Sequence, residues 1–339
     1  MILHAMKKQS KNVLVTGAAG FIGYHLCLRL MKEGYTVVGL DNINSYYDIN
    51  LKKNRIKELN SSNKKFKFYK IDLKYKNQIE KLFKKYEFKK IFHLAAQAGV
   101  RKSIKFPISY VNNNILATTN LFEVLKNYKN VKMFLASSSS VYGIQNTNIY
   151  STNLKTDSPI QMYAVSKKCT ELVGHSYSYQ YQIPVFALRF FTVYGPWGRP
   201  DMALFNFTKN IYEKKTINVY NNGNHYRDFT YIDDIINQIL LISEKKYSNE
   251  SLKKKNYFSV YNLGNGKPFK LMKFINLIEQ ELNIKAKIKY LPSQPGDMIG
   301  THSDMSKFYK DYKKIKKIPL KLGIRNFINW FKKYYNYDQ

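Results

Sequence analysis

A tyrosine and a lysine four residues apart are the pair in this chain best suited to move a proton. Tyr163 and Lys167 occur in the segment Tyr-Ala-Val-Ser-Lys, and side chains at this spacing share one face of a helix. An ammonium group near a phenol favours the phenolate and draws the phenol pKa, about 10 when unperturbed, towards neutral pH. Ser138, in the run of four serines at 137–140, could hold the reacting oxygen. The three residues predict general acid–base chemistry centred on Tyr163.

The Tyr-Lys spacing alone is weak evidence, because the chain has 29 tyrosines and the spacing recurs at Tyr86. What distinguishes Tyr163 is its context. The serine run directly follows an expected strand at 131–136, and Tyr163 opens an expected helix at 162–181. Residues just beyond the strand ends of a parallel sheet face the ligand crevice, so Ser138 and Tyr163 are expected to meet there.

A glycine-rich turn near the N-terminus predicts a dinucleotide site. Gly17, Gly20 and Gly23 lie between an expected strand at 12–16 and an expected helix at 21–32. Glycines in such a turn let the backbone approach a pyrophosphate closely, and the helix N-terminus then faces the phosphates. A glycine-rich turn by itself is a weak signal. The prediction depends on the expected strand directly before the turn and the expected helix directly after it.

Two aspartates at strand ends bear on which dinucleotide binds. Asp41 directly follows the expected strand 35–40. A carboxylate there accepts hydrogen bonds from both ribose hydroxyls and repels a 2′-phosphate, and neither neighbour is an arginine, so NAD is favoured over NADP. Asp72, after the expected strand 66–71, could bond the adenine amine, but a helix N-cap is an equally good interpretation.

Strands and helices are expected to alternate along most of the chain. The expected strands are 12–16, 35–40, 66–71, 90–94, 131–136, 184–189 and 259–263, and the expected helices include 21–32, 78–86, 104–128 and 162–181. This alternation predicts an α/β fold with a Rossmann-like, doubly wound parallel sheet. Clusters of Gly and Pro interrupt the pattern beyond residue 190. We expect a cofactor-binding domain at 1–189, with returns near 229–263, and a smaller, discontinuous C-terminal substrate lobe at 190–339.

The composition limits the class of protein. With 339 residues, 44% of them hydrophobic, the chain can bury one large core or two modest ones. No apolar run reaches the roughly 18 residues of a membrane span, and the first twelve residues are too short and too polar for a signal peptide. Two cysteines exclude a disulfide framework, and Cys27 and Cys169 are expected in helix cores. A cytoplasmic protein without a metal site is expected.

The formal net charge of +33 could indicate a nucleic-acid partner. However, all but seven of the 56 basic residues are lysines, scattered in pairs along the chain with no basic tail. Lys, Asn, Ile, Tyr and Phe are all abundant, and A/T-rich codons encode all five. Nucleotide composition could therefore produce the excess without a partner. Nucleic-acid binding is not favoured, and whether the charge has a function stays open.

Four longer segments resemble the nucleotide-sugar epimerases of the extended short-chain dehydrogenase/reductase family, and most of all the UDP-glucuronate 4-epimerases. They are His-Leu-Ala-Ala-Gln-Ala-Gly-Val-Arg at 93–101, Ser-Ser-Ser-Ser-Val-Tyr-Gly at 137–143, Arg-Phe-Phe-Thr-Val-Tyr-Gly-Pro-Trp-Gly-Arg-Pro-Asp-Met at 189–202 and Arg-Asp-Phe-Thr-Tyr-Ile-Asp-Asp at 227–234. The third segment is the most discriminating. The resemblance covers residues 12 to about 304.

The resemblance implies an isomerase that keeps NAD tightly bound. Tyr163 takes the proton of the sugar 4-hydroxyl while NAD accepts hydride from C4, and hydride returns to the other face of the 4-keto sugar, which inverts C4. Lys167 also bonds the nicotinamide ribose, and Arg227 contacts the UDP. The expected cofactor residues are Gly17, Gly20, Phe21, Ile22, Gly23, Asp41, Asp72, Leu73 and Lys167. The expected substrate residues are Ser139, Ser140, Thr192, Arg199, Arg227 and Asp297.

The resemblance also favours a hexuronate as the sugar. Oxidation at C4 of a glucuronate gives a β-keto acid that readily loses CO2, so the site should hold the carboxylate fixed. Thr192 and Arg199 match the family positions thought to do this, and the planar fork of an arginine suits a carboxylate. The alternative is that Arg199 is a solvated loop arginine. Gln294 stands where many 4-epimerases of neutral sugars have an arginine, so the diphosphate contact of that loop stays open.

Other functions compete with this one. A UDP-glucose or UDP-N-acetylhexosamine 4-epimerase is the nearest competitor. A nucleotide-sugar 4,6-dehydratase normally has an acidic pair beside the catalytic hydroxyl, where this chain has Ser139 and Ser140. A non-catalytic RNA-binding relative would have lost Tyr163, Lys167 or a glycine of the turn, and none is lost.

The family further implies a homodimer, formed through the helices expected at 104–128 and 162–181, and a role in surface polysaccharide synthesis. The histidines are expected to be structural. His93 ends a strand as a packed side chain, and His225 and His302 lack the spacing of metal ligands. For Trp197, packing of the loop and contact with substrate are equally good interpretations.

Overall fold

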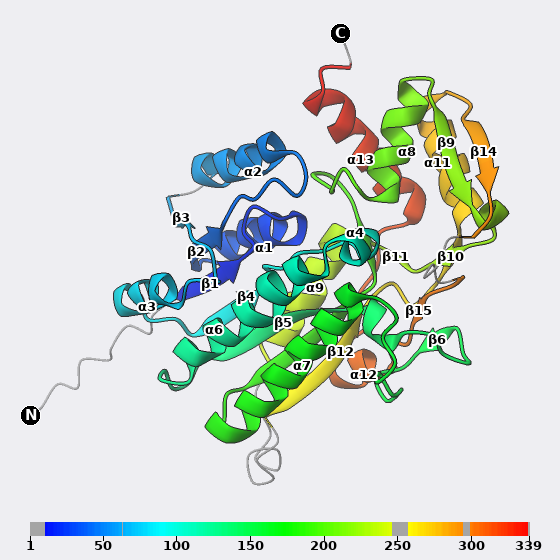
Figure 1. The fold of residues 1–339 in the computed structure, drawn as a ribbon. Coiled ribbons are helices and arrows are strands. Elements are labelled where there is room, and N and C mark those ends of the chain that lie inside the picture. Colours follow the sequence, from blue (N-terminus) through cyan, green and yellow to red (C-terminus); the bar gives the residue numbers. More distant parts are fainter. Residues whose placement is uncertain (1–10, 63, 246–256, 294–298, 338–339) are drawn as a thin grey trace, which may run out of the picture.

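A seven-stranded parallel sheet forms the centre of the protein (Figure 1). The computed structural model describes residues 11–62, 64–245, 257–293 and 299–337. The strands lie in the order β12-β7-β5-β4-β1-β2-β3. They are β1 (Asn12–Thr16), β2 (Thr36–Asp41), β3 (Phe66–Lys70), β4 (Lys90–His93), β5 (Lys132–Ser138), β7 (Val185–Phe190) and β12 (Phe258–Leu263). The predicted α/β fold is confirmed, and each expected strand is present with its ends shifted by two residues at most.

Two groups of helices cover the two faces of this sheet. One group packs over Val13 and Val15 of β1 and comprises α1 (Phe21–Lys32), α2 (Ile49–Ser62) and α9 (Ile232–Ser243). The other packs over Leu14 and comprises α3 (Lys76–Lys85), α6 (Ala117–Leu125) and α7 (Met162–Tyr181). Successive residues of one strand therefore enter separate cores, as expected for a strand buried on both sides.

The prediction of a single helix at 104–128 is wrong. The chain there forms α4 (Val100–Lys105), α5 (Pro107–Tyr110), a π-helical segment (Val111–Leu116) and α6. Pro107 ends α4, because it lacks an N–H and excludes the helical conformation at Phe106, where φ is −131° and ψ is 58°. The π-helical segment turns Asn114 into the interior, where it is 1% exposed.

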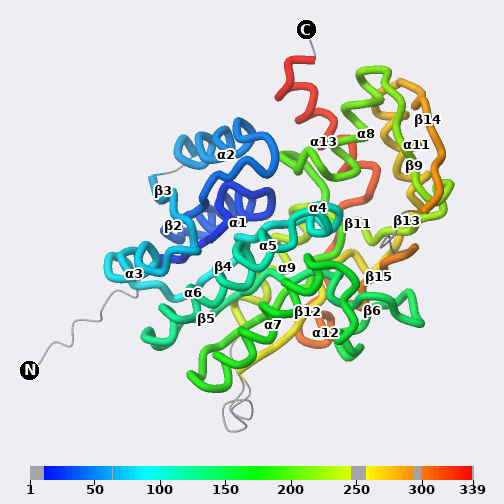
Figure 2. The backbone as a smooth tube through the Cα atoms, in the orientation of Figure 1, coloured from blue at the N-terminus to red at the C-terminus, as the bar shows by residue number. Residues whose placement is uncertain are grey.

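In the described part of the chain, other segments form four two-stranded sheets and four further helices beside the central sheet. The strand pairs are β8 (Thr192–Tyr194) with β11 (Phe229–Tyr231), β9 (Thr216–Tyr220) with β14 (Lys287–Leu291), β10 (Tyr226–Arg227) with β13 (Phe269–Lys270), and β6 (Ile149–Tyr150) with β15 (His302–Ser303). The helices are α8 (Ala203–Tyr212), α11 (Leu271–Leu282), α12 (Ser306–Asp311) and α13 (Leu320–Tyr334). The tube in Figure 2 shows α8, α11, β9 and β14 together at one end, far from α3. Where the domains divide stays a prediction.

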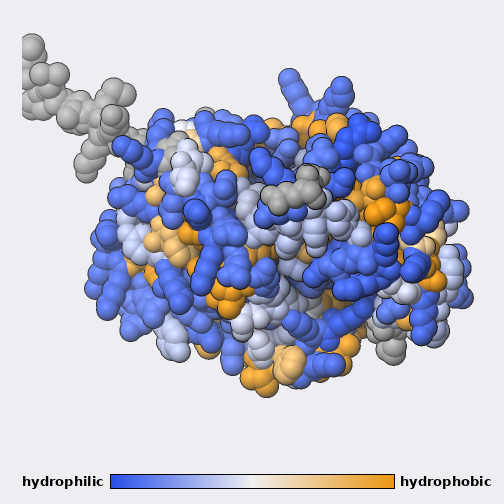
Figure 3. Space-filling model, turned by 90° about the horizontal axis from the view of Figure 1, so that it is seen from above, coloured by the Kyte–Doolittle hydropathy of each residue, from blue (hydrophilic) through white to orange (hydrophobic). Residues whose placement is uncertain are grey.

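The face seen in Figure 3 is mostly hydrophilic, and its apolar side chains lie in small separate patches. Within the described ranges, no helix combines the length and the apolar character needed to cross a membrane. The same residues contain no group of three or more His, Cys, Asp or Glu side chains that could hold a metal ion. Cys27 is buried as expected, whereas Cys169 is only half-buried, and both are free thiols. The prediction that the N-terminus is not a signal peptide concerns mainly residues 1–10, which lie outside the described residues.

Two histidines, His93 and the half-buried His25, should make stability depend on pH below neutrality. His93 lies between Thr16 (2.8 Å) and Thr118 (2.9 Å), and His25 of α1 bonds the carbonyl of Pro196 (2.9 Å). Burial lowers the pKa of His93 to about 3 and that of His25 to about 4. The unfolded chain protonates both below about 6.5, whereas the folded protein protonates neither. The free energy of unfolding should therefore fall as the pH drops from 6.5 towards 4, by up to ~1.4 kcal/mol per pH unit for each histidine.

Urea titrations between pH 7 and pH 5 test this pH dependence. His25→Phe should make the decline shallower by the contribution of one proton. The matched control is His175→Gln, which changes an exposed histidine of α7 and should keep the wild-type slope. Equal slopes for wild type and His25→Phe would contradict the assignment.

Candidate active site

A cavity of about 970 Å³ lies along the carboxyl ends of the central strands. It brings together residues that are far apart in the sequence, from Gly17 to Thr301. All expected site residues that the structure describes line it: Gly17, Gly20, Phe21, Ile22, Gly23, Asp41, Asp72, Leu73, Ser138, Ser139, Ser140, Tyr163, Lys167, Thr192, Arg199 and Arg227. Asp297 and Gln294 lie outside the described residues. The position of these side chains is thus a finding, and their individual roles stay predictions.

The glycine turn leaves no room for side chains. Gly17 has φ +72°, and a Cβ atom on Gly23 would lie 2.0 Å from the Gly17 carbonyl oxygen. The first turn of α1 can therefore pack directly on the backbone of the turn only because both residues are glycine. A backbone exposed in this way, at a helix N-terminus, fits the pyrophosphate of a dinucleotide.

Replacing Gly23 by alanine should remove the bound dinucleotide. The added methyl group would push the Gly17 carbonyl, and with it the whole turn, out of place. We expect Gly23→Ala to be purified with less than a tenth of the wild-type NAD content, measured by absorbance after release of the cofactor. Gly300→Ala is the matched control, because its added Cβ would meet nothing closer than 3.7 Å. A full complement of NAD in Gly23→Ala would contradict the assignment.

Two carboxylates line the cofactor half of the cavity. Asp41 accepts hydrogen bonds from the backbone N–H groups of Ile43 (2.8 Å) and Ala19 (3.2 Å). Burial raises its pKa, while the Ile43 bond and the Lys52 ammonium oppose this shift. Asp72 does not cap a helix, since α3 has Tyr75 at its N-cap, so that interpretation is wrong. The Asp41 carboxylate beside the glycine turn fits the ribose of NAD.

Tyr163 and Ser138 meet at the cavity wall, and Lys167 lies one helical turn beyond Tyr163. Ser138, at the end of β5, lies beside Tyr163 and acts to lower the pKa of its phenol. The Ser138 hydroxyl also accepts the N–H of Ser140 (3.2 Å), which fixes its orientation. Lys167 donates from Nζ to the carbonyl of Ala136 (2.8 Å) and is 5% exposed. These groups could together bind a hydroxyl group and move its proton.

The predicted direction of the Tyr163 pKa shift is wrong. Burial raises the pKa of Tyr163, and it outweighs the opposing effects of the Ser138 hydrogen bond and the Arg199 charge. The ammonium of Lys167 bonds a backbone carbonyl, and burial lowers its own pKa to about 8, against the attraction of Glu171. Arg199, not Lys167, is thus the cation that stabilises the phenolate in this structure.

The π-helical segment orients the helix that carries Tyr163. The Asn114 side chain accepts the N–H of Gln97 (2.7 Å) and donates to its carbonyl (3.0 Å). The same amide donates to Ser166 of α7 (2.8 Å), between Tyr163 and Lys167 in sequence. A buried amide thus ties the loop after β4 to the helix that carries Tyr163. Sequence reasoning missed Asn114, and a π-helix gives no hydropathy signal that would find it.

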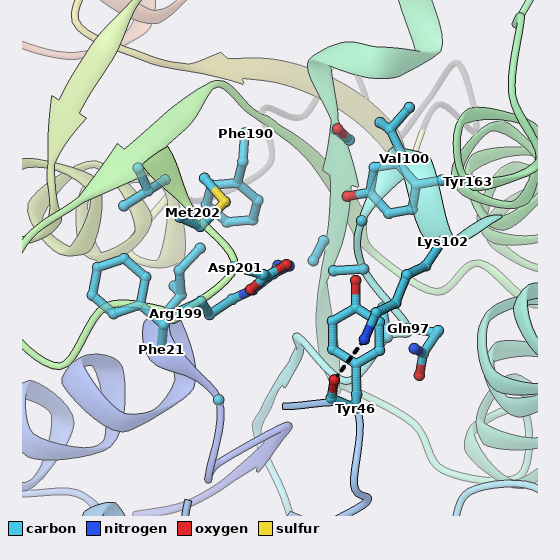
Figure 4. A pocket seen from close by; sticks show the side chains of 18 of the residues that line it. Phe21, Tyr46, Gln97, Val100, Lys102, Tyr163, Phe190, Arg199, Asp201 and Met202 are labelled. Atoms are coloured by element: carbon cyan, nitrogen blue, oxygen red, sulfur yellow. Dashed lines mark hydrogen bonds and ion pairs between the residues drawn. The ribbon is translucent and has the colours of Figure 1, made fainter. Parts of the chain in front are cut away.

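Arg199 reaches into the cavity from the wall opposite Tyr163 (Figure 4). Its Nε and Nη2 atoms donate to the two carboxylate oxygens of Asp201, at 3.0 and 2.5 Å. The arginine side chain is 19% exposed, so the alternative of a solvated loop arginine is wrong. Asp201 occupies one edge of the fork and leaves the Nη1 edge for a ligand. Thr192 lines the same cavity at the start of β8.

Tyr46 and Lys102 also line this part of the cavity, and sequence reasoning missed both. The Lys102 ammonium donates to the Tyr46 carbonyl (2.8 Å, dashed in Figure 4) and lies 4.1 Å from the centre of the Tyr46 ring. The Arg199 guanidinium lies 5.8 Å from the same ring. A Cβ atom on Gly99, at φ +95°, would lie 2.0 Å from the Tyr46 hydroxyl. Gly99, in the segment 93–101, was the sequence feature that could have indicated a close approach of another side chain, here Tyr46.

The model of the NAD dependent epimerase/dehydratase family matches residues 13–264 of the chain. The chain belongs to this family. It is 41% identical to the UDP-glucuronate 4-epimerase of Thermodesulfobacterium geofontis, over 94% of this chain and 95% of that protein. Among solved structures, it resembles the UDP-glucuronic acid 4-epimerase of Bacillus cereus in complex with UDP-glucuronic acid and NAD, with 34% identity, a TM-score of 0.87, and 96% and 100% of the two chains covered.

A third relative of this epimerase/dehydratase is named for a different substrate from the two relatives above. The UDP-glucose 4-epimerase of Thermotoga maritima, solved with UDP-glucose, is 26% identical with a TM-score of 0.83, and 96% and 99% of the two chains are covered. The predicted family and the predicted cofactor, NAD, are confirmed. The glycine turn and Asp41 fit that cofactor.

Proposed function

We propose that this epimerase/dehydratase inverts C4 of UDP-glucuronate and produces UDP-galacturonate. The observation that carries the proposal is the Arg199 guanidinium, which lines the cavity opposite Tyr163. The carboxyl carbon of a hexuronate is attached to C5, next to the reacting C4. A group that binds this carboxylate must therefore face the same cavity as the group that acts on the 4-hydroxyl, as Arg199 and Tyr163 do.

Arg199 suits a carboxylate better than a neutral hydroxymethyl group. A planar guanidinium offers parallel N–H donors that match the two oxygens of a carboxylate. Asp201 already fixes the orientation of this fork, and Thr192 adds a hydroxyl group nearby. A 4-keto hexuronate is a β-keto acid, so the same contacts would hold its carboxylate away from the geometry in which CO2 is lost.

The side chains of this protein would handle the proton of the 4-hydroxyl. NAD, when bound, accepts the C4 hydride and returns it to the opposite face. Tyr163 would take the proton from O4 and later give it back, while Ser138 holds the same oxygen. Lys167 lies beside them as an ammonium group up to a pH of about 8. The serine hydroxyls and the Tyr163 phenol thus provide proton transfer without a metal ion.

Two other reactions are possible on this fold, and each has less support. A neutral-sugar 4-epimerase, such as the Thermotoga maritima relative, has no need for a buried arginine at the C5 substituent. A 4,6-dehydratase needs an acid near the catalytic hydroxyl, where this chain has Ser139 and Ser140. Asp201 would be a poor acid. Burial acts to raise its pKa, but the Arg199 charge and hydrogen bonds hold the pKa below its ordinary value.

Product analysis with three substrates tests the proposal. Purified protein is incubated separately with UDP-glucuronate, UDP-glucose and UDP-N-acetylglucosamine, and the sugars are identified by NMR. We expect UDP-galacturonate from the first and at least tenfold slower conversion of the other two. Preferred conversion of UDP-glucose would identify the neutral-sugar alternative, and a 4-keto-6-deoxy product would identify the dehydratase.

The proposed partner is a second copy of this chain. Large apolar side chains are exposed on α5, on α7 and between α4 and α5, among them Ile108 (68%), Tyr179 (67%) and Phe106 (62%). α4 and α5 both contact α7, so these three helices lie side by side. We expect a dimer by light scattering at micromolar concentration and a monomer after the double change Phe106→Lys and Ile108→Lys. Tyr290→Lys, at an exposed site on β14, is the control. A wild-type monomer would contradict the proposal.

A further inference from the structure

The loop that presents Arg199 is held in place by two side chains from other helices. Three successive backbone carbonyls, at 196–198, accept hydrogen bonds. His25 of α1 donates to the first (2.9 Å), and Arg55 of α2 donates from Nη2 to the next two (2.6 and 3.3 Å). Arg199 follows directly in the chain. The three bonds therefore fix the backbone from which its side chain extends.

The other end of the Arg55 fork holds the glycine turn. Its Nη1 donates to the carbonyl of Ala19 (2.8 Å) and to the Tyr47 hydroxyl (2.6 Å). Ala19 lies between Gly17 and Gly20, the glycines that fit the cofactor pyrophosphate. One rigid guanidinium thus spans the cofactor turn and the Arg199 loop. Lysine, which is a point charge on a flexible stem, has no such fork.

A buried arginine such as Arg55 is unusual where a side chain only stabilises the fold. Its side chain is completely buried, and its Nε atom has no hydrogen-bond partner. Its four hydrogen bonds within the described residues all go to neutral oxygen atoms. Burying a guanidinium removes its hydration, and neutral acceptors offset that loss only in part. What this arrangement does achieve is a fixed distance between two loops.

The backbone of the loop needs such support. Trp197, at its centre, has φ +59°, a left-handed conformation that residues other than glycine rarely adopt. Its indole packs against Tyr24 of α1 and against Trp330 and Tyr334 of α13. Strained conformations persist only where the surroundings enforce them. Here the enforcing groups are Arg55, His25 and these aromatic rings.

We propose that Arg55, assisted by His25, is a positioning residue that sets Arg199 relative to the cofactor turn and thereby protects the substrate carboxylate. The proposal rests on the hexuronate substrate proposed above. If the carboxylate of the 4-keto sugar is not held, the C5–C6 bond breaks and CO2 leaves. The electron pair of that bond forms the C4–C5 enolate, and C5 then takes a proton from water. The product is a UDP-linked 4-keto pentose, and the cofactor stays reduced.

The first test compares Arg55→Lys with Arg29→Lys, which changes an exposed arginine of α1. We expect Arg55→Lys to lower kcat/KM for UDP-glucuronate about 10²-fold, since misplacing a substrate contact by about 1 Å has such an effect. The fraction of decarboxylated product and of reduced cofactor should rise at the same time. Arg29→Lys should change none of these. In an Arg199→Ala background, Arg55→Lys should add nothing, because the residue that it positions is gone.

A second measurement separates binding from turnover. In a Tyr163→Phe background, calorimetry with UDP-glucuronate and with UDP should show that Arg55→Lys weakens only the former. His25→Phe keeps the ring contacts of His25 with Phe21 and Tyr24 but removes the N–H donor. It should act in the same direction, and it replaces Arg55→Lys if that variant does not fold.

Three results would overturn the proposal. They are wild-type behaviour of Arg55→Lys, an undiminished effect of Arg55→Lys in the Arg199→Ala background, and equal weakening of UDP and UDP-glucuronate. Measurements on the wild type distinguish a failure of this positioning role from a failure of the proposed function. If the wild type converts UDP-glucose but not UDP-glucuronate, the hexuronate substrate is wrong. If the wild type converts UDP-glucuronate and Arg55→Lys matches Arg29→Lys, only the positioning role is wrong.

Discussion

Tyr163→Phe should abolish turnover while cofactor and substrate still bind. The change removes only the hydroxyl of Tyr163, and the ring keeps its edge contact with Tyr110, with the ring centres 6.2 Å apart. Loss of a positioned general acid–base group lowers rates by about 10²–10⁴-fold. We expect kcat for UDP-glucuronate to fall within this range, measured by NMR, with the NAD content unchanged.

The control for this variant lies on the same helix. Tyr179→Phe removes the hydroxyl of a tyrosine that is 67% exposed near the end of α7, and it should turn over substrate like the wild type. The dissociation constant of UDP-glucuronate should change less than threefold in Tyr163→Phe. A kcat within tenfold of the wild-type value would mean that another group moves the proton.

Arg199→Ala should remove the selectivity for a hexuronate. Hydrogen bonds to charged groups are worth about 1.5–3 kcal/mol each, so losing a two-bond contact should lower kcat/KM for UDP-glucuronate by 10²-fold or more. The decarboxylated product should appear among the remaining products. Any slow conversion of UDP-glucose should be unaffected, because its neutral C5 substituent needs no cation.

The partner of Arg199 complicates this variant, and a second variant resolves the complication. Arg199→Ala leaves the Asp201 carboxylate without its cation, and this negative charge would itself repel a hexuronate. The double change Arg199→Ala and Asp201→Asn removes both charges. If Arg199 binds the carboxylate, the double variant stays at least 10²-fold impaired. Recovery of the wild-type rate in the double variant would mean that Arg199 only neutralises Asp201.

The sequence predicts the central sheet well because each strand is a short apolar run bounded by turn residues. The same reasoning missed α2, whose apolar residues are sparse among its lysines and polar residues. Three of these, Leu51, Ile56 and Leu59, are buried. Lys52 and Arg55 of this helix are buried too, at 5% and 0% exposure. A basic residue that packing turns inward has the same sequence signal as a solvated one, so Arg55 could not be distinguished from a surface residue.

Sequence motifs predicted which residues line the candidate site. They did not predict the ion pairs and pKa shifts, which depend on how the side chains are buried. The segment 189–202 led to Arg199, but Asp201, two residues further on, received no role because spacing does not reveal an ion pair. The Tyr-Lys spacing placed Tyr163 correctly at the cavity. It gave the wrong direction for the pKa of Tyr163, because a helical spacing does not show that Lys167 bonds a backbone carbonyl or how strongly burial acts on the phenol.

The strands and the Arg199 loop are fixed by different kinds of contact. Ser138 ends β5, which is paired along its length with β7, so the whole backbone ladder holds the serine that lies beside Tyr163. Arg199 instead depends on a short loop that His25 and Arg55 hold by side-chain hydrogen bonds. The two parts of the site can therefore change independently in evolution. If the hexuronate proposal holds, exchanging the loop that bears Arg199, while residues 25 and 55 are kept, should change the preferred sugar and leave the glycine turn in place.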